Sequence, residues 1–187
     1  EQIDESLAAR PVSPYAASKL ATEAYALSWS HSYGLPVLAL RLFNVFGPLQ
    51  SPTHSYAAVV PAFLSAAMQN RPLPLHGDGS QSRDFTFVGT VVSVIADALQ
   101  RRVASYDPVN LAFGAQVSLL TLISHLEGIL DRPLPVESLP IRAGDVPRSQ
   151  ADSTVLRELF PTIEPTALED GLRATADWFN ASRPWER

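Results

Sequence analysis

The most constraining feature of this chain is a long helix signal that passes directly into the signal for a buried strand. Ser13 can cap free backbone amides and a proline follows it, so the pattern predicts a helix over residues 14–33. Gly34 after this Ala-rich stretch is a typical stop signal. The apolar run 37–42 has the length of a buried strand and leads into a loop over 44–54. This order predicts an α/β fold whose loop carries function.

The rest of the chain alternates in the same way, without an internal repeat. We expect helices over 57–69, 91–102, 119–130, 152–160 and 166–181, and strands over 73–75, 83–88, near 110 and over 134–138. Thr90 and Ser118 are the expected caps of the helices that follow them.

Composition excludes several classes of protein. The chain has 187 residues, 46% of them hydrophobic, which is ordinary for a globular protein and not for a disordered one. With no cysteine and no histidine pair at metal-ligand spacing, we expect no disulfide, no metal site and no cysteine nucleophile. A net charge of -5 with a single positive doublet argues against nucleic acid as a partner. No run reaches the length of a membrane helix and the acidic start is unlike a signal peptide, so we expect a cytoplasmic protein with no membrane partner.

The only lysine of the chain lies four residues after a tyrosine. Of the 14 positively charged residues, 13 are arginine and the exception is Lys19. Tyr15 and Lys19 share one face of the predicted helix, and Tyr15 lies in the first turn, where the helix dipole is positive. Both positive charges favour a tyrosinate, and a phenol acts as a base near neutrality only when its anion is stabilised. The alternative is an ordinary helix pair with a packed tyrosine and a solvated lysine.

Four segments in a fixed order resemble a known family. They are PYAASK at 14–19, RLFNVFGP at 41–48, GDGSQSRDF at 77–85 and RAGDVP at 142–147. Together they resemble the signatures of the extended short-chain dehydrogenases/reductases that act on nucleotide sugars, the NAD-dependent epimerase/dehydratase family. The nearest resemblance is to UDP-glucose 4-epimerase and UDP-N-acetylglucosamine 4-epimerase.

The resemblance implies a doubly wound, Rossmann-like NAD-binding domain with a small α/β substrate domain. We expect residues 1–47 and 86–111 in the NAD-binding domain and residues 48–85 and 112–187 in the substrate domain. The Gly-rich turn for the cofactor pyrophosphate, the first βαβ unit and an upstream catalytic Ser/Thr are absent from this sequence. We therefore interpret the chain as the C-terminal part of a longer polypeptide and expect the isolated 187 residues to be inactive.

The resemblance also implies roles at the cofactor. Tyr15 would take a proton from the sugar hydroxyl at carbon 4, while NAD takes hydride from that carbon. Lys19 would hold the ribose of NAD beside Tyr15, and Phe43 would lie near the nicotinamide. The helix that carries Tyr15 is expected to pair with its copy in a homodimer, because the small residues Ala17, Ala21 and Ala24 permit close approach.

Five further residues are implied to bind a UDP-sugar. Asn44 would bond to the diphosphate, Arg83 and Arg142 would clamp it, Asp145 would lie near the nucleotide ribose, and His76 would lie next to the uracil. Local sequence leaves other interpretations open for three of them. Arg83 could be a surface charge on a strand, Arg142 a loop arginine paired with Asp145, and His76 a half-buried strand histidine.

The function that the resemblance implies is an NAD-dependent nucleotide-sugar 4-epimerase, an isomerase. Its substrate would be UDP-glucose or UDP-galactose, or a UDP-N-acetylhexosamine. One alternative is a nucleotide-sugar 4,6-dehydratase, whose distinguishing acid and base would lie upstream of Glu1. The other is a non-catalytic relative that keeps the fold to bind a dinucleotide.

Overall fold

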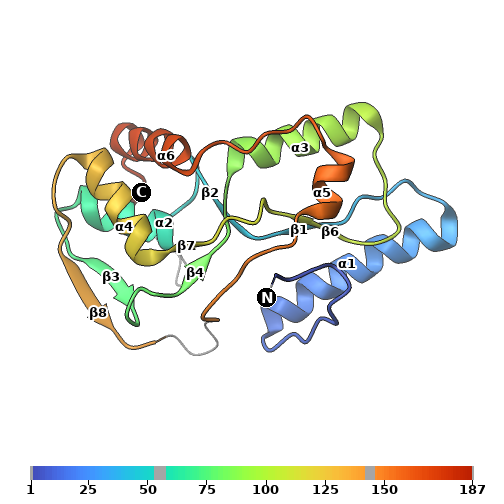
Figure 1. Ribbon diagram of the computed structural model, residues 1–187, viewed down its shortest axis with the longest axis horizontal. Coiled ribbons are helices and arrows are strands. Elements are labelled where there is room, and N and C mark those ends of the chain that lie inside the picture. Colours follow the sequence, from blue (N-terminus) through green and yellow to red (C-terminus); the bar gives the residue numbers. More distant parts are fainter. Residues whose placement is uncertain (1, 53–57, 142–145, 187) are drawn as a thin grey trace.

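The computed structural model describes residues 2–52, 58–141 and 146–186 and confirms the mixed α/β class (Figure 1). The helices are α1 (Pro14–Tyr33), α2 (Val59–Met68), α3 (Val88–Arg101), α4 (Leu119–Leu130), α5 (Thr154–Leu159) and α6 (Leu168–Ser182), followed by the short 3-10 helix η1 (Pro184–Glu186). The strands are β1 (Leu40–Leu42), β2 (Asn44–Phe46), β3 (Leu73–His76), β4 (Ser82–Arg83), β5 (Phe85–Phe87), β6 (Val109–Leu111), β7 (Val117–Ser118) and β8 (Val136–Leu139).

The strands associate in pairs that are distant in sequence. β1 pairs with β6, β2 with β5 and β3 with β8, all in parallel, while β4 and β7 are antiparallel. Parallel neighbours need a crossover connection, and helices supply those crossovers here. This topology agrees with the predicted partial doubly wound sheet.

Two hydrophobic clusters stabilise the two ends of the molecule. Around β1 and β6, α1 lies on one side and α3 with α5 on the other (Figure 1). Val94, Val109 and Leu111 are fully buried there, and α5 packs on β6. At the other end, α2, α4 and α6 enclose the larger cluster, in which Phe63 and Phe179 are buried.

Helix α1 has the predicted bounds because both of its ends carry caps. The Ser13 hydroxyl accepts a hydrogen bond from the Ala16 amide at 3.1 Å, and Gly34 ends the helix with φ +66°. Within α1 only Ser30 is buried, so its packing against the rest of the described chain is slight. Its large exposed side chains are Tyr15, Tyr25, Trp29 and Tyr33.

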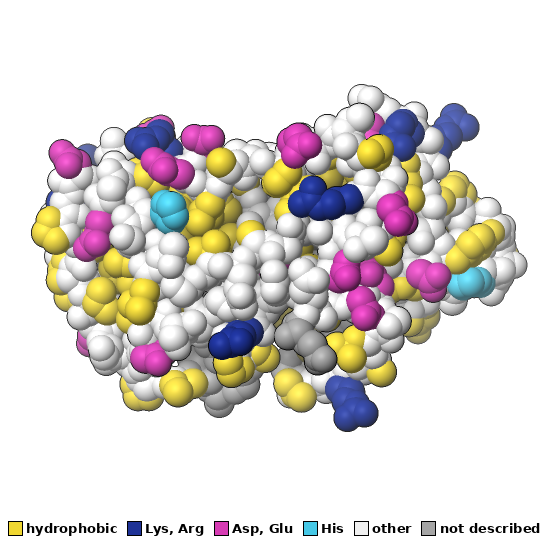
Figure 2. Space-filling model, viewed as in Figure 1, with side chains coloured by type: hydrophobic (Ala, Val, Ile, Leu, Met, Phe, Trp, Pro, Cys, Tyr) yellow, Lys and Arg dark blue, Asp and Glu magenta, His cyan; other side chains and the backbone are white. Residues whose placement is uncertain are grey.

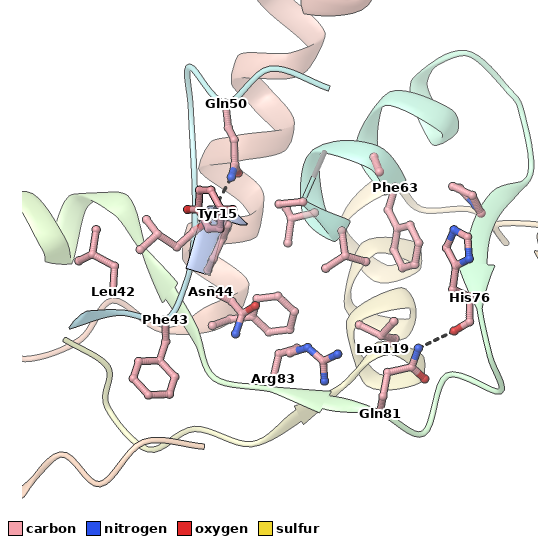
Figure 3. Close-up of a pocket in the computed structure, with 18 residues that line it drawn as sticks. Tyr15, Leu42, Phe43, Asn44, Gln50, Phe63, His76, Gln81, Arg83 and Leu119 are labelled. Atoms are coloured by element: carbon pink, nitrogen blue, oxygen red, sulfur yellow. Dashed lines mark hydrogen bonds between the residues drawn. The ribbon is translucent and has the colours of Figure 1, made fainter. Parts of the chain in front are cut away.

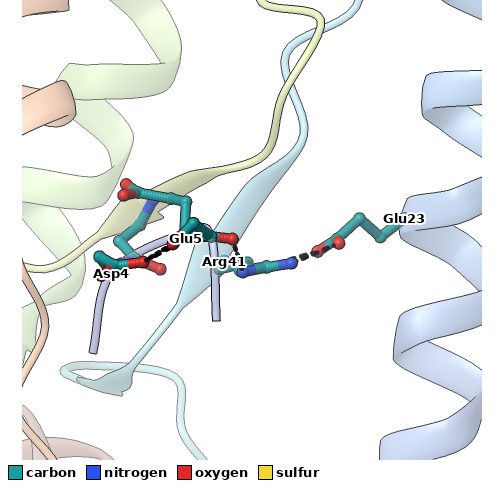
Figure 4. A network of polar contacts seen from close by, with 6 residues as sticks. Asp4, Glu5, Glu23 and Arg41 are labelled. Atoms are coloured by element: carbon teal, nitrogen blue, oxygen red, sulfur yellow. Dashed lines mark hydrogen bonds and ion pairs between the residues drawn. The ribbon is translucent and has the colours of Figure 1, made fainter. Parts of the chain in front are cut away.

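Arg41 of β1 joins α1 to the sheet (Figure 4). Its Nε and Nη2 both donate to the Glu23 carboxylate at 2.8 Å, and its Nη1 donates to the Glu5 carbonyl at 3.0 Å. The hydrogen bonds to Glu23 raise the pKa of Arg41. This ion pair connects the helix that carries Tyr15 with the strand that leads to Asn44.

Three local predictions were wrong. α3 begins at Val88, not at 91, and its N-cap is Phe87, because the chain passes from β5 into the helix without a loop. Thr90 therefore lies inside the helix, where its hydroxyl accepts a hydrogen bond from the Thr166 amide at 3.0 Å. Residues 44–46 form β2 and not loop, because they pair with β5, and the strand predicted over 83–88 is interrupted at Asp84.

The division into two domains stays a prediction. α5 lies in the range expected for the substrate domain, yet it packs on β6 from the range expected for the NAD-binding domain. Among the described residues, no helix combines the length and the apolar character needed to cross a membrane.

Candidate functional site

A cleft of about 500 Å³ opens between the start of α1 and the α2–β3 region (Figure 3). This volume lies in the usual range for small-molecule sites. Five residues that the sequence predicted as site residues line it: Tyr15, Phe43, Asn44, His76 and Arg83. Tyr15 and Asn44 lie on one side of the cleft and His76 on the other.

Tyr15 stands at the mouth of the cleft in the first turn of α1. Its side chain is 72% exposed, so the alternative of a packed tyrosine is wrong for the described chain. The Lys19 ammonium lies 5.4 Å from the centre of the Tyr15 ring, one helical turn further along. Within residues 2–52, 58–141 and 146–186, Lys19 makes no ion pair, so its ammonium can donate to a ligand beside Tyr15.

Phe43 and Asn44 follow the carboxyl end of β1, where ligands bind in open parallel sheets. The Asn44 amide and its side-chain Nδ2 both donate to the Asp84 carbonyl, at 3.2 and 3.4 Å. These bonds hold the Asn44 side chain against the strand that carries Arg83. Its Oδ1 accepts no hydrogen bond from the described residues and can accept one from a ligand or a water in the cleft.

Arg83 supplies the positive charge of the cleft. Its guanidinium points from β4 toward the middle of the cleft (Figure 3), and its Nη1 donates to the Ser82 carbonyl at 2.8 Å. A half-buried guanidinium beside amide groups is suited to a diphosphate, since its planar donors match phosphate oxygens. Arg83 lies on a strand, as the alternative also expected, but it is half-buried and lines the cleft.

His76 ends β3 on the far side of the cleft. Its Nδ1 lies 2.8 Å from the Pro140 carbonyl, so Nδ1 carries the proton and Nε2 is the acceptor in the neutral ring. His76 is half-buried on a strand, as the alternative from sequence expected. It also lines the cleft.

The turn after β3 is fixed by Asp78. The Ser80 hydroxyl and amide donate to its carboxylate at 2.7 and 2.9 Å, and these bonds lower the pKa of Asp78. The Gln81 side chain then donates back to the His76 carbonyl (Figure 3). This local network determines where β3 ends and where the chain turns toward Arg83.

Sequence reasoning missed several residues of the cleft. Gln50 and Gln81 contribute side-chain amides, and Phe63 and Leu119 contribute apolar walls. Gln50 Nε2 donates to the Val45 carbonyl at 3.3 Å, while its buried Oε1 has no hydrogen-bond partner among the described residues. Gln81 lies in the segment GDGSQSRDF, but that pattern does not mark it as a cleft residue, and no motif includes Gln50.

Two predicted substrate residues, Arg142 and Asp145, lie outside the described residues. In the part of the chain that is described, no group of three or more His, Cys, Asp or Glu side chains could hold a metal ion.

Residues 1–112 match the model of the NAD dependent epimerase/dehydratase family, and the chain therefore belongs to that family. A curated relative is the UDP-glucose 4-epimerase of Mycolicibacterium smegmatis. It is 34% identical over 175 residues, which are 94% of this chain and 55% of the relative.

Solved structures of UDP-sugar epimerases share the fold. One is the UDP-N-acetylglucosamine 4-epimerase of Methanobrevibacter ruminantium in complex with UDP-N-acetylmuramic acid. It is 36% identical with a TM-score of 0.87, and the match covers 96% of this chain and 57% of the epimerase chain. Another is the UDP-glucose 4-epimerase of Thermotoga maritima with UDP-glucose. It is 30% identical with a TM-score of 0.87, and the match covers 97% of this chain and 58% of the epimerase chain. The chain thus spans about half the length of the relatives that it matches.

Proposed function

We propose that the protein, at its natural length, is an NAD-dependent nucleotide-sugar 4-epimerase. Its substrate would be UDP-glucose or UDP-galactose, or a UDP-N-acetylhexosamine. The observation that carries this proposal is the convergence of Tyr15, Asn44, His76 and Arg83 on one cleft from four separate elements or loops. The family of the chain and the UDP-sugar epimerases that it resembles support the same function.

The diphosphate of the substrate would bind at the centre of the cleft. Arg83 can bond two phosphate oxygens at once, and the Asn44 side chain lines the same cleft. His76, on the other side of the cleft, would present its Nε2 acceptor to the base. The sugar would then extend toward Tyr15 at the opposite end.

Tyr15 would act as the acid and base of the reaction. Its side chain is exposed in the first turn of α1, and the Lys19 ammonium lies 5.4 Å from the centre of its ring. Tyr15 would accept the proton of the 4-hydroxyl and later return it to the oxygen of the turned 4-keto sugar. The sugar gains and loses one proton over the cycle, so only the configuration at carbon 4 changes.

The residues at the start of α1 fit NAD. Lys19 is exposed and has no carboxylate partner among the described residues, which leaves its donors for ribose hydroxyls, and Phe43 lines the same cleft as Tyr15. When bound there, NAD supplies the hydride acceptor and donor for carbon 4.

A cytoplasmic homodimer is part of this proposal. Ala17, Ala21 and Ala24 are exposed on α1, as are Tyr25 and Trp29, so this helix offers small and aromatic side chains to a second copy. On the face shown in Figure 2, hydrophobic side chains reach the surface between scattered charged ones.

The test is an assay for conversion of UDP-galactose to UDP-glucose with NAD, using the protein at its natural length. Accumulation of a 4-keto-6-deoxy sugar in place of the epimer would indicate a dehydratase. If neither product forms while UDP-glucose and NAD still bind, a non-catalytic relative is the correct interpretation.

A further inference from the structure

Asp84 is a fully buried carboxylate that the proposed chemistry does not use. It is the single residue between β4 and β5, and its exposed fraction is 0%. At this point the chain changes neighbours, from antiparallel pairing with β7 to parallel pairing with β2.

The side chain of Asp84 fastens two distant segments to this junction. Its Oδ2 accepts hydrogen bonds from the Gly114 amide at 3.0 Å and from the Ala151 amide at 3.2 Å. Gly114 belongs to the connection between β6 and β7, and Ala151 to the segment before α5. The same segment also bonds to the backbone of Ser82. The Ser149 amide donates to the Ser82 carbonyl, and the Ser82 amide donates to the Pro147 carbonyl.

The backbone of Asp84 faces the cleft residues. Its carbonyl accepts both hydrogen bonds from Asn44, and its two chain neighbours, Arg83 and Phe85, line the cleft. A change in the backbone position at Asp84 therefore moves Asn44 and Arg83 together.

This arrangement costs folding free energy. Burial raises the pKa of Asp84, and the amide hydrogen bonds offset this only in part. Its Oδ1 is buried with no hydrogen-bond partner among the described residues. An apolar side chain would avoid this cost but could not bind the two amides.

We propose that Asp84 is a positioning residue of the cleft, whose carboxylate fixes the junction of β4 and β5 so that Arg83 and Asn44 face the substrate diphosphate. The inference rests on the proposed function, because the diphosphate is the ligand that these two side chains would bind. Asp84 itself is fully buried and does not line the cleft.

The experiment measures UDP-glucose affinity by calorimetry for the wild type, Asp84→Ala and Asp84→Asn, in the protein at its natural length. Asp84→Ala should weaken binding about 10-fold or more, because both amide bonds are lost and the two binding side chains are displaced. Asp84→Asn keeps an acceptor for the amides and should stay within about threefold of the wild type. Rescue by asparagine separates positioning from any requirement for charge.

Val94→Ala is the matched control for stability. Val94 is fully buried in α3 and does not line the cleft, so its truncation should lower the urea midpoint of unfolding and leave the affinity unchanged. If Asp84→Ala does not fold, Asp84→Ser replaces it, since its hydroxyl is too short to reach both amides.

NMR of the Asn44 side-chain amide gives a second readout that needs no ligand. Its resonance should shift in Asp84→Ala and stay near the wild-type position in Asp84→Asn and Val94→Ala. If the wild type does not bind UDP-glucose, the proposed function fails, while this resonance still tests Asp84. The inference on Asp84 is overturned if Asp84→Ala leaves the resonance unchanged, or if it binds as the wild type does, or if Val94→Ala loses as much affinity.

Discussion

The ion pair between Glu23 and Arg41 should contribute more to stability than a surface pair does. Arg41 holds both carboxylate oxygens of Glu23 at 2.8 Å, and the side chains are only 18% and 27% exposed for Glu23 and Arg41. At an effective dielectric constant of about 20, two charges at about 4 Å attract by roughly 4 kcal/mol, and desolvation opposes much of that. We therefore expect a coupling free energy of about 1–2 kcal/mol.

A double-mutant cycle measures this coupling. Urea unfolding of the wild type, Glu23→Gln, Arg41→Met and the double variant gives the four free energies of unfolding. The matched control is the cycle for Glu169 and Arg173, which form an ion pair at 3.0 Å on the surface of α6 with both side chains more than half exposed. That pair should give about 0.3–0.5 kcal/mol.

The coupling free energies of the two ion pairs should also respond differently to salt. At about 1 M salt, where the Debye length is about 3 Å, the coupling of Glu169 and Arg173 should vanish while most of that of Glu23 and Arg41 persists. Equal couplings in the two cycles, or equal loss in salt, would refute the reasoning that Arg41 fastens α1 to the sheet.

Three other predictions follow from single contacts. Arg83→Gln should weaken UDP-glucose binding by about 10- to 100-fold with little change in unfolding, because a charge-assisted contact to phosphate is lost, and unchanged affinity in a titration would contradict this. Gly171→Ala in α6 should lower stability by about 1–2 kcal/mol, since the new Cβ would lie 2.9 Å from atoms of Phe46 and Phe87, whereas Gly128→Ala in α4 meets nothing within 4 Å and should stabilise by up to about 1 kcal/mol. If both glycine variants change the urea midpoint in the same direction, the packing at Gly171 is not as described. Because the pKa of Asp84 is raised in the folded state, the folded protein binds the extra proton at this site, and the contribution of Asp84 to stability falls as pH rises from about 4. The free energy of unfolding of the wild type minus that of Asp84→Asn should therefore decrease with pH in urea titrations, and a constant difference would count against the shift.

Elements with strong local signals were predictable from sequence. Ser13 and Gly34 fix both ends of α1, and Ser118 caps α4 by accepting from the Thr121 amide, so both helices have the predicted bounds. In each case the deciding contacts lie within four residues of the cap, where sequence patterns are informative.

Elements that depend on distant partners were not predictable. β2 lies in a Pro- and Gly-containing stretch and forms because Asn44 pairs with Phe85. Thr90 resembles a cap, yet its partner is Thr166, 76 residues away. Such pairings arise from tertiary packing, which overrides local preference.

The residues of the candidate site also differ in how far sequence could predict them. Tyr15, Asn44 and Arg83 could be named because they lie in recognisable motifs, and all three line the cleft. Asp84 lies in such a motif too, but its role depends on the amides of Gly114 and Ala151, which are 30 and 67 residues away. No pattern around Asp84 indicates those contacts.

The most direct test of the account compares the wild type with Tyr15→Phe, at natural length, for epimerisation of UDP-galactose and for UDP-glucose binding. The account predicts that the wild type turns over, and that kcat falls by about 100-fold or more in the variant, because the proton at the 4-hydroxyl loses its acceptor. The affinity for UDP-glucose should stay within a few-fold, since Arg83 and Asn44 are untouched. A variant that is as active as the wild type would contradict the role of Tyr15, and a wild type that binds no UDP-glucose would contradict the assignment of the cleft.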